Sequence, residues 1–335
     1  MKNIKLLDCT LRDGGSINNF IFGSEALIEI YQSLNDAKID MIELGFIDNN
    51  TINDINSTKK PSNSHFDELK INNKNCKIYA MIDFSKYNFN NFNITKRKNL
   101  DGIRLMFKKE QQNDAIYFAK KIKELNYEIS LNPVSITRYS KEEFIDLINK
   151  ANKLEPYFFY MVDTYGLMNE IETLEYFNLL EKHLDKNIQI GYHVHDNLQL
   201  AFKNAIEIIN QKTTREIIID CSLFGMGKRA GNVRTEDIAN FLNNNFKKNY
   251  DVAILQKIID NKIKPLKSNY EWGFSQIHYI AGKNKCHSDY VTYLNKEKNI
   301  SLDEIDKLLK IFDENKRLSF DAEYANLIAR NFTKW

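Results

Sequence analysis

The sequence predicts an α/β protein built as a closed (β/α)8 TIM barrel with a C-terminal helical extension. Short apolar, β-branched runs alternate with amphipathic helical stretches, which is typical of βα units around a parallel sheet. Most of the apolar runs are continuous, as expected for strands that are covered on both faces. These strand patterns stop before residue 250, so we assign residues 1–248 to the barrel and residues 249–335 to the helical segment of this 335-residue chain.

Eight runs qualify as strands, and their number is what favours a closed barrel. They are residues 4–8, 40–46, 77–84, 102–107, 128–134, 158–163, 188–194 and 216–223. The fifth run is weakened by Pro133, which cannot donate a ladder hydrogen bond. The alternative, an open doubly wound sheet, would place G-x-G-x-x-G after the first strand. The chain instead has Cys-Thr-Leu-Arg-Asp-Gly-Gly at residues 9–15.

Helical patterns separate most of these strands, and we expect about eight helices in the barrel. The clearest amphipathic stretches are residues 24–38, 113–126, 140–154, 169–184, 197–210 and 235–246. Ser24 is the expected cap of the first stretch, whereas Ser140 and Glu143 have the spacing of a capping box. Ser301 and Glu304 repeat that spacing in the C-terminal segment. Residues 47–76, which include Pro61, form the longest connection without a helical pattern.

Composition excludes several classes of protein. Hydrophobic residues make up 43% and charged residues 27%, which is ordinary globular composition. The net charge of +2 argues against a nucleic-acid partner, and no apolar run is long enough for a membrane span. The chain has 4 dispersed cysteines and no C-x-x-C pair, and its N-terminus lacks a secretory pattern. We therefore expect a cytoplasmic protein with reduced thiols.

Polar residues end nearly every predicted strand, and active sites of this barrel lie at those ends. Arg12 and Asp13 follow the first strand, Glu43 lies in the second, Arg104 in the fourth, and Thr164 follows the sixth. A barrel without a function would not need a polar residue at so many strand ends. We predict that Arg12, Glu43, Arg104 and Thr164 bind the substrate.

The sequence His193-Val194-His195 indicates a metal site. Residues two apart in a strand share a face, so the two imidazoles should converge. Asp13 would lie nearby because the first and last strands of a closed barrel are neighbours, and Asn232 could add a second oxygen. Mixed nitrogen and oxygen ligation suits Mn²⁺ or Mg²⁺, with Co²⁺, Fe²⁺ and Zn²⁺ as alternatives. Taken singly, either histidine could be a hydrogen-bonded or exposed residue without a metal, and Asp13 could be a helix cap or turn residue.

Residues 225–232, Gly-Met-Gly-Lys-Arg-Ala-Gly-Asn, are rich in glycine but lack Walker spacing. They form either a plain turn or a loop whose backbone N–H groups face an anion.

Three motifs together resemble the DRE-TIM metallolyase superfamily, whose members are HMGL-like proteins. They are Asp8-Cys9-Thr10-Leu11-Arg12-Asp13-Gly14, His193-Val194-His195-Asp196-Asn197 and Gly225-Met226-Gly227-Lys228-Arg229-Ala230-Gly231-Asn232. This superfamily includes 4-hydroxy-2-oxovalerate aldolase, HMG-CoA lyase, and the isopropylmalate and homocitrate synthases. Tyr270-Glu271-Trp272-Gly273, followed by Asn284 and His287, looks like the aldolase branch and like aldolase-like proteins from surface-polysaccharide gene clusters.

The resemblance implies roles for the residues of these motifs. Asp13, His193 and His195 would hold the metal, Asn232 would be a fourth or nearby ligand, and Arg12 would face the enolate oxygen. Arg12 and Asp13 would therefore be the catalytic residues. The implied activity is that of a lyase or aldolase that forms or cleaves a C–C bond next to pyruvate or a similar 2-oxo acid. It would proceed through a metal-bound enolate with an aldehyde as the second reactant.

One departure leaves the general base open. The 4-hydroxy-2-oxovalerate aldolases carry a histidine three residues after the metal aspartate, where this chain has Ser16. Side chains of the C-terminal segment could take its place by closing over the barrel mouth: Tyr279, Tyr290, His278 and His287.

Two other functions fit the same sequence. One is an acyl-CoA condensing synthase of the isopropylmalate synthase type, whose G-x-G-x-R-A-G-N motif fits residues 225–232. The other is a weakly active scaffold or partner subunit. In that case residues 249–335 would support a homodimer or dock a dehydrogenase that takes the aldehyde.

Overall fold

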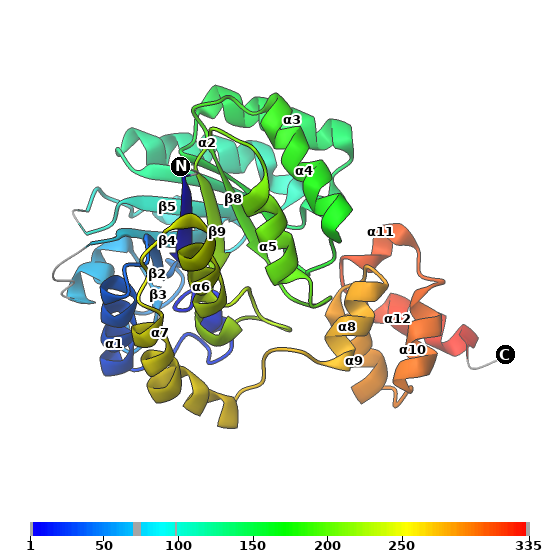
Figure 1. The fold of residues 1–335 in the computed structure, drawn as a ribbon. Coiled ribbons are helices and arrows are strands. Elements are labelled where there is room, and N and C mark those ends of the chain that lie inside the picture. The colour runs from blue at the N-terminus through cyan, green and yellow to red at the C-terminus, as the bar shows by residue number, and fades with distance from the viewer. Residues whose placement is uncertain (1–2, 70–74, 98, 333–335) are drawn as a thin grey trace.

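The computed structural model, which describes residues 3–69, 75–97 and 99–332, confirms the predicted (β/α)8 barrel (Figure 1). Its eight barrel strands are β1 (Ile4–Asp8), β2 (Met41–Ile47), β4 (Lys77–Asp83), β5 (Gly102–Phe107), β6 (Glu128–Pro133), β7 (Phe158–Asp163), β8 (Gln189–Val194) and β9 (Ile217–Cys221). All are parallel to their neighbours, and β1 pairs with both β9 and β2, which closes the ring. A two-residue strand, β3 (Lys59–Lys60), adds to β2.

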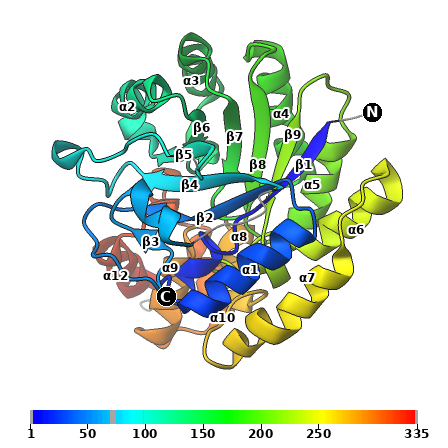
Figure 2. The ribbon, with the colours of Figure 1, turned by 90° about the vertical axis from the view of Figure 1, so that its left-hand side faces the viewer.

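Six α-helices follow strands of the barrel in the described ranges, fewer than the eight we expected (Figure 2). They are α1 (Ser24–Asp36), α2 (Gln112–Glu124), α3 (Lys141–Leu154), α4 (Glu170–His183), α5 (Ala201–Asn210) and α6 (Thr235–Phe246). The connections after β2 and β4 carry 3-10 turns at Asn63–Leu69 and Phe89–Asn91 instead. Both are rich in asparagine and serine, whose side chains compete for backbone hydrogen bonds. Of the predicted connection 47–76, residues 70–74 lie outside the described residues.

The two predicted capping boxes are confirmed. At the start of α3, the Glu143 N–H donates to Ser140 Oγ at 3.2 Å, and the Ser140 N–H donates to Glu143 Oε2 at 2.7 Å. Ser301 and Glu304 exchange the same pair of hydrogen bonds. Each box satisfies backbone N–H groups that a helix start otherwise leaves unpaired.

The predicted cap at Ser24 is wrong. Gly23 precedes α1 with φ of 85°, a left-handed value that suits glycine, so Ser24 is already the first helical residue and no side chain caps this helix. The Ser24 N–H is instead satisfied by Asn56 Oδ1 at 3.1 Å, from the connection after β2.

The barrel interior has its own hydrophobic cluster, formed by Leu7, Cys9, Met41, Tyr79, Phe158, Tyr160, Val162 and Ile218. Tyr160 fits because its neighbour across the sheet is Gly191, where a Cβ atom would come within 2.3 Å of the ring. The Arg104 guanidinium lies 4.3 Å from the centre of the Tyr160 ring. The charged Arg104 side chain is therefore in direct contact with the aromatic residues of this cluster.

The C-terminal region is helical, as predicted. Its helices are α7 (Val252–Ile258), α8 (Gln276–Lys283), α9 (Ser288–Lys296), α10 (Leu302–Leu309), α11 (Glu314–Arg317) and α12 (Ala322–Phe332). α7 joins the main core through Leu255 and Ile258, whereas the later helices enclose a second cluster around Tyr290 and Leu308. Figure 1 shows α8–α12 as a group beside the barrel. Within the described ranges, no helix combines the length and apolarity that crossing a membrane requires.

We expect Ser140→Ala to lower the free energy of unfolding by about 1 kcal/mol, because the start of α3 loses its side-chain acceptor. Ser24→Ala is the matched control and should change it by less than about 0.5 kcal/mol, since that hydroxyl caps nothing. Urea denaturation followed by circular dichroism measures both. Equal effects of the two substitutions would contradict the capping assignment.

Candidate functional site

Asp13, His193 and His195 meet at the C-terminal ends of β1 and β8. Each offers one ligand atom, and these atoms all lie within 4.8 Å of one another. His195 Nε2 is 3.7 Å from Asp13 Oδ2, and the two imidazole centres are 5.2 Å apart. All three residues are buried. Strand alternation directs both histidines inward with Val194 facing the outer helices, so the structure brings together the residues that the sequence pattern singled out.

Asn232 lies against this group. Its Nδ2 donates to Asp13 Oδ2 at 2.8 Å and to the Met226 carbonyl at 3.2 Å. Its Oδ1 is buried and has no hydrogen-bond partner among the described residues. A side chain at Gly227 would collide here, since a Cβ atom would come within 2.2 Å of Asn232 Nδ2. A buried amide oxygen without a donor, next to a carboxylate and two imidazoles, fits a bound cation.

The ionisation states also fit a metal ligand set. Burial lowers the pKa of His195 to about 3, so this imidazole is neutral at pH 7. Burial would raise the pKa of Asp13, but the charge of Arg12 and the hydrogen bond from Asn232 act in the opposite direction, and the pKa lies well below its ordinary value. His195 Nδ1 donates to the Lys228 carbonyl at 3.1 Å, which leaves Nε2 with its lone pair on the side of Asp13. A neutral imidazole and an ionised carboxylate are the forms that bind metals.

His193 is held by a carboxylate that the sequence analysis missed. Its Nδ1 lies 2.9 Å from Asp220 Oδ2, and Arg104 Nη2 donates to the same oxygen at 2.5 Å. Burial opposes ionisation of Asp220, but Arg104 and the hydrogen bond from His193 lower its pKa. An ionised carboxylate only accepts, so His193 Nδ1 is the donor and Nε2 is free for a ligand. The signal in the sequence was a single aspartate in an apolar strand, Ile-Ile-Ile-Asp-Cys.

Arg12 is fixed by carboxylates on two sides. Its Nε donates to Glu43 Oε2 at 2.6 Å and its Nη1 to Asp13 Oδ1 at 3.0 Å. Glu43 Oε2 also accepts from Arg104 Nη1 at 2.9 Å. Burial would lower the pKa of Arg12, but Glu43 and Asp13 raise it, so the guanidinium stays charged.

These contacts form one buried chain of alternating charge, which we name the interior charge network. Its members in order are Asp13, Arg12, Glu43, Arg104, Asp220 and His193. Three carboxylates face two guanidinium groups, and a histidine that binds a metal does so in its neutral form, so the histidines add no charge as ligands. One negative charge is therefore left uncompensated inside the barrel, which favours binding of a cation there.

The remaining predicted site residues have other contacts. Glu43 and Arg104 are 0% and 1% exposed, and they pair with each other inside the network. Thr164 follows β7, and its Oγ1 accepts from the Ser135 N–H at 2.8 Å. In the part of the chain that the structure describes, no hydrogen bond or ion pair joins Thr164 to Asp13 or to the histidines. Substrate binding by Glu43, Arg104 and Thr164 stays a prediction.

Of the residues considered as a base, His287 contacts the loop after β9. Its Nε2 is 3.3 Å from Arg229 Nη2, and its ring centre is 4.9 Å from that of Tyr165. Burial lowers the pKa of His287 to about 4. The serine at the position of the expected histidine has a structural contact instead, since Ser16 Oγ donates to the Asp13 carbonyl at 2.6 Å.

The other three candidates belong to the C-terminal helices. The Tyr290 hydroxyl lies in the second core, where it bonds to backbone carbonyls of Lys316 and Ser319 at 2.9 and 2.8 Å. Tyr279 is 42% exposed and its ring lies beside Phe274. Burial lowers the pKa of His278 to about 4. Within the described residues, no hydrogen bond joins either tyrosine to Asp13, His193 or His195.

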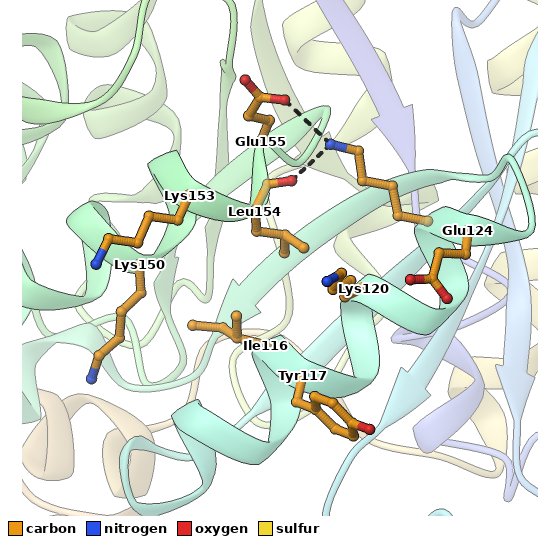
Figure 3. Close-up of a pocket in the computed structure, with 9 residues that line it drawn as sticks. Ile116, Tyr117, Lys120, Glu124, Lys150, Lys153, Leu154 and Glu155 are labelled. Carbon is orange, nitrogen blue, oxygen red and sulfur yellow. Dashed lines mark hydrogen bonds and ion pairs between the residues drawn. The ribbon is translucent and has the colours of Figure 1, made fainter.

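A groove of about 510 Å³ lies between α2 and α3 (Figure 3). Lysines line it together with Ile116 and Leu154, and Lys123 Nζ donates to the Leu154 carbonyl at 2.7 Å. The groove lies at the C-terminal ends of both helices. Because barrel helices run antiparallel to the strands, this is the end of the barrel opposite to the metal-ligand group. We assign no chemistry to it.

Comparisons with known proteins support the fold. The profile of the HMGL-like family matches residues 3–262. The chain is 25% identical over 244 residues to 4-hydroxy-2-oxovalerate aldolase of Geobacillus thermodenitrificans, covering 70% of this chain and 68% of that protein. It is 22% identical over 264 residues to 2-isopropylmalate synthase of Bacillus velezensis, covering 71% of this chain but only 47% of the synthase.

Among solved structures, the N-terminal domain of a candidate aldolase from Bacteroides vulgatus superposes with a TM-score of 0.74 and 26% identity. The match covers 88% of this chain and 98% of that domain.

We expect Asp220→Asn to weaken Mn²⁺ binding by about 10–100-fold, because the amide no longer holds His193 Nδ1 as a charged acceptor does. Isothermal titration calorimetry on the purified protein measures the affinity, and the absorption spectrum of added Co²⁺ provides a second readout. Asp146→Asn is the matched control, since that carboxylate lies on α3 and pairs with Lys150. Parental affinity in a folded Asp220→Asn protein would show that Asp220 does not position His193.

Proposed function

The chain belongs to the HMGL-like family, and from this premise we propose that it is a divalent-metal-dependent aldolase acting on a pyruvate-like 2-oxo acid. The observation that carries the proposal is the convergence of Asp13, His193 and His195, with the Arg12 guanidinium bonded to Asp13. The resemblance to DRE-TIM metallolyases is thereby confirmed at the level of the family. A link to surface-polysaccharide gene clusters, a homodimer and a dehydrogenase partner stay predictions.

The metal-ligand group would hold a divalent cation, with Mn²⁺ or Mg²⁺ as our first choice because two of its ligands are oxygens. Asp13, His193 and His195 would be ligands, and Asn232 Oδ1 would be the fourth. A bound cation supplies Lewis acidity, which polarises a keto group and stabilises the charge that develops on its oxygen.

Arg12 would stabilise the same developing charge. Its Nε and Nη1 are engaged by Glu43 and Asp13, whereas its Nη2 has no hydrogen bond within the described part of the chain. The guanidinium therefore has a donor left for a substrate oxygen, and its orientation is already fixed before the substrate arrives. Preorganised donors of this kind contribute much of the catalysis in enzymes that stabilise oxyanions.

The charge balance of the site also favours a monoanionic substrate. The interior charge network has one excess negative charge, so a divalent cation would leave one excess positive charge. A 2-oxo acid carries one negative charge and would make the buried site neutral. Water is largely excluded, since the four proposed ligands are each at most 6% exposed.

The aldol hydroxyl must give up its proton to a base when a C–C bond is cleaved. We propose His287 for this role, because among the four candidates it contacts the loop after β9 through Arg229. Its neutral form at pH 7 can accept a proton.

The match to 2-isopropylmalate synthase favours a second candidate, condensation of an acyl-CoA with a 2-oxo acid. That reaction would use the same 2-oxo acid site but release a free thiol. Thiol release from acetyl-CoA, measured across several 2-oxo acids, distinguishes the two functions.

The Mn²⁺-loaded protein should exchange the methyl protons of pyruvate in D₂O, because polarising the keto group acidifies them. Proton NMR measures the exchange. Removal of metal with EDTA and the substitution His193→Ala should each reduce it to the background rate. His183→Ala, at the end of α4, is the matched control. Exchange that is the same with and without metal would end the proposal.

Arg12→Lys should slow this exchange by about 100-fold at saturating pyruvate, since an ammonium group lacks the planar fork that reaches Glu43, Asp13 and the substrate together. Arg234→Lys, on an exposed side chain before α6, should leave the rate unchanged. If Arg12→Lys retains the parental rate, Arg12 has no part in the reaction.

A further inference from the structure

A second cavity opens at the barrel mouth beside the metal-ligand group. It has a volume of about 50 Å³ and lies at the ends of β2, β4 and β5, with Lys228 from the loop after β9 on its remaining side. Two contacts place it next to the site. The Arg12 guanidinium lies 5.9 Å from the centre of the Phe46 ring, which lines the cavity. His195 donates to the backbone carbonyl of Lys228.

Apolar side chains form much of the cavity wall, namely Phe20, Phe46 and Met106. The Phe20 and Phe46 rings pack edge to face with centres 5.6 Å apart. A wall of this kind favours a short carbon chain, because apolar surface is removed from water on binding. The volume limits that chain to a few atoms beyond the reacting carbon.

The charged residues of the cavity are not balanced. Lys59 Nζ pairs with Asp48 at 3.3 Å, and Lys86 Nζ pairs with Asp83 at 3.5 Å. Lys228 also lines the cavity, but it has no ion pair in the described ranges of the chain. One positive charge is therefore left without a partner at the cavity.

The surroundings of Lys228 add to this excess. The charged groups that act on it most strongly are Asp13, Arg229, Lys86 and Arg12, so three of the four are cationic. Asp13 is already committed to Arg12 and Asn232. An anionic group at this place would lie among cations, while a neutral group would gain nothing from them.

We propose that this cavity binds the second substrate of the aldolase reaction, and that this substrate is a short aldehyde bearing a carboxylate or phosphate that Lys228 recognises. The inference rests on the proposed function, because it assigns the other half of the same site. Lys228 is on this view the specificity-determining residue for the aldehyde, while the 2-oxo acid is bound by the metal-ligand group and Arg12.

The reaction balances without a further reactant. A proton leaves the methyl carbon next to the keto group, and the resulting carbon nucleophile forms a C–C bond to the aldehyde carbon. The aldehyde oxygen gains one proton, which gives a 4-hydroxy-2-oxo acid with a second anionic group. In the reverse direction the same bond breaks and the same proton returns to carbon.

The test compares aldehydes that are matched in length and differ in charge. Succinic semialdehyde is paired with butanal, and glyceraldehyde 3-phosphate with glyceraldehyde, each with pyruvate and the Mn²⁺-loaded protein. The parent should show a kcat/KM at least about tenfold higher for the anionic member of one pair, as expected for a charge-assisted contact. A preference in the first pair would show that Lys228 recognises a carboxylate, and a preference in the second pair would show that it recognises a phosphate.

Lys228→Ala should reduce that preference by about tenfold or more, chiefly through KM for the aldehyde, and Lys228→Glu should reverse it. Both substitutions keep the backbone carbonyl that orients His195. Lys228→Arg should restore most of the preference. Lys120→Ala, on the outer surface of α2, is the matched lysine control.

The outcomes separate this inference from the proposed function. Absence of pyruvate proton exchange in the parent overturns both. Exchange without any preference for an anionic aldehyde, or a preference that Lys228→Ala leaves unchanged, overturns the inference alone. A rise in KM for pyruvate with no change in aldehyde preference would assign Lys228 to the 2-oxo acid and also overturn it.

Discussion

The interior charge network is the constraint on which the site depends. Asp220 holds His193 at one end, Glu43 holds Arg12 near the other, and Arg104 joins the two carboxylates across the barrel. Buried charges are costly unless each has a partner of opposite sign, and removing one member leaves its neighbours uncompensated. The orientation of the guanidinium and the tautomer of the imidazole are therefore set by the same contacts that make these charges tolerable inside the protein.

Local patterns were sufficient to predict the strands, the two capping boxes and the inward direction of both histidines. Each of these follows from spacing along the chain, with a period of two in a strand or three residues between a cap and its partner. The network could not be predicted in this way, because Asp220, Glu43 and Arg104 come from three strands and meet only through the register of the closed sheet. The lack of a helix after β2 was visible in the sequence, since residues 47–76 have no helical pattern, but the expectation of about eight helices for a closed barrel overrode that signal.

The C-terminal helices are tied to the loops that carry the site. Asn197, which lies two residues after His195, donates from its Nδ2 to Ser288 Oγ at 3.2 Å. Lys285 forms an ion pair with Glu172 at the start of α4. His287 contacts Arg229 in the loop after β9. The loops after β8 and β9 and the start of α4 thus contact the same part of the C-terminal region. Movement of α8 and α9 against the barrel would displace these segments together.

The site consequently contains two kinds of charge. Those of the interior charge network are buried and bonded to one another, so they offer the same environment to whichever molecule enters. Lys228 is exposed and unpaired among the described residues, and its side chain can be changed without altering a strand. The relatives named aldolase and synthase share the barrel of this chain but differ in the reaction that their names describe. A fixed network beside a loop residue that can be substituted without altering a strand would allow one fold to support different second substrates.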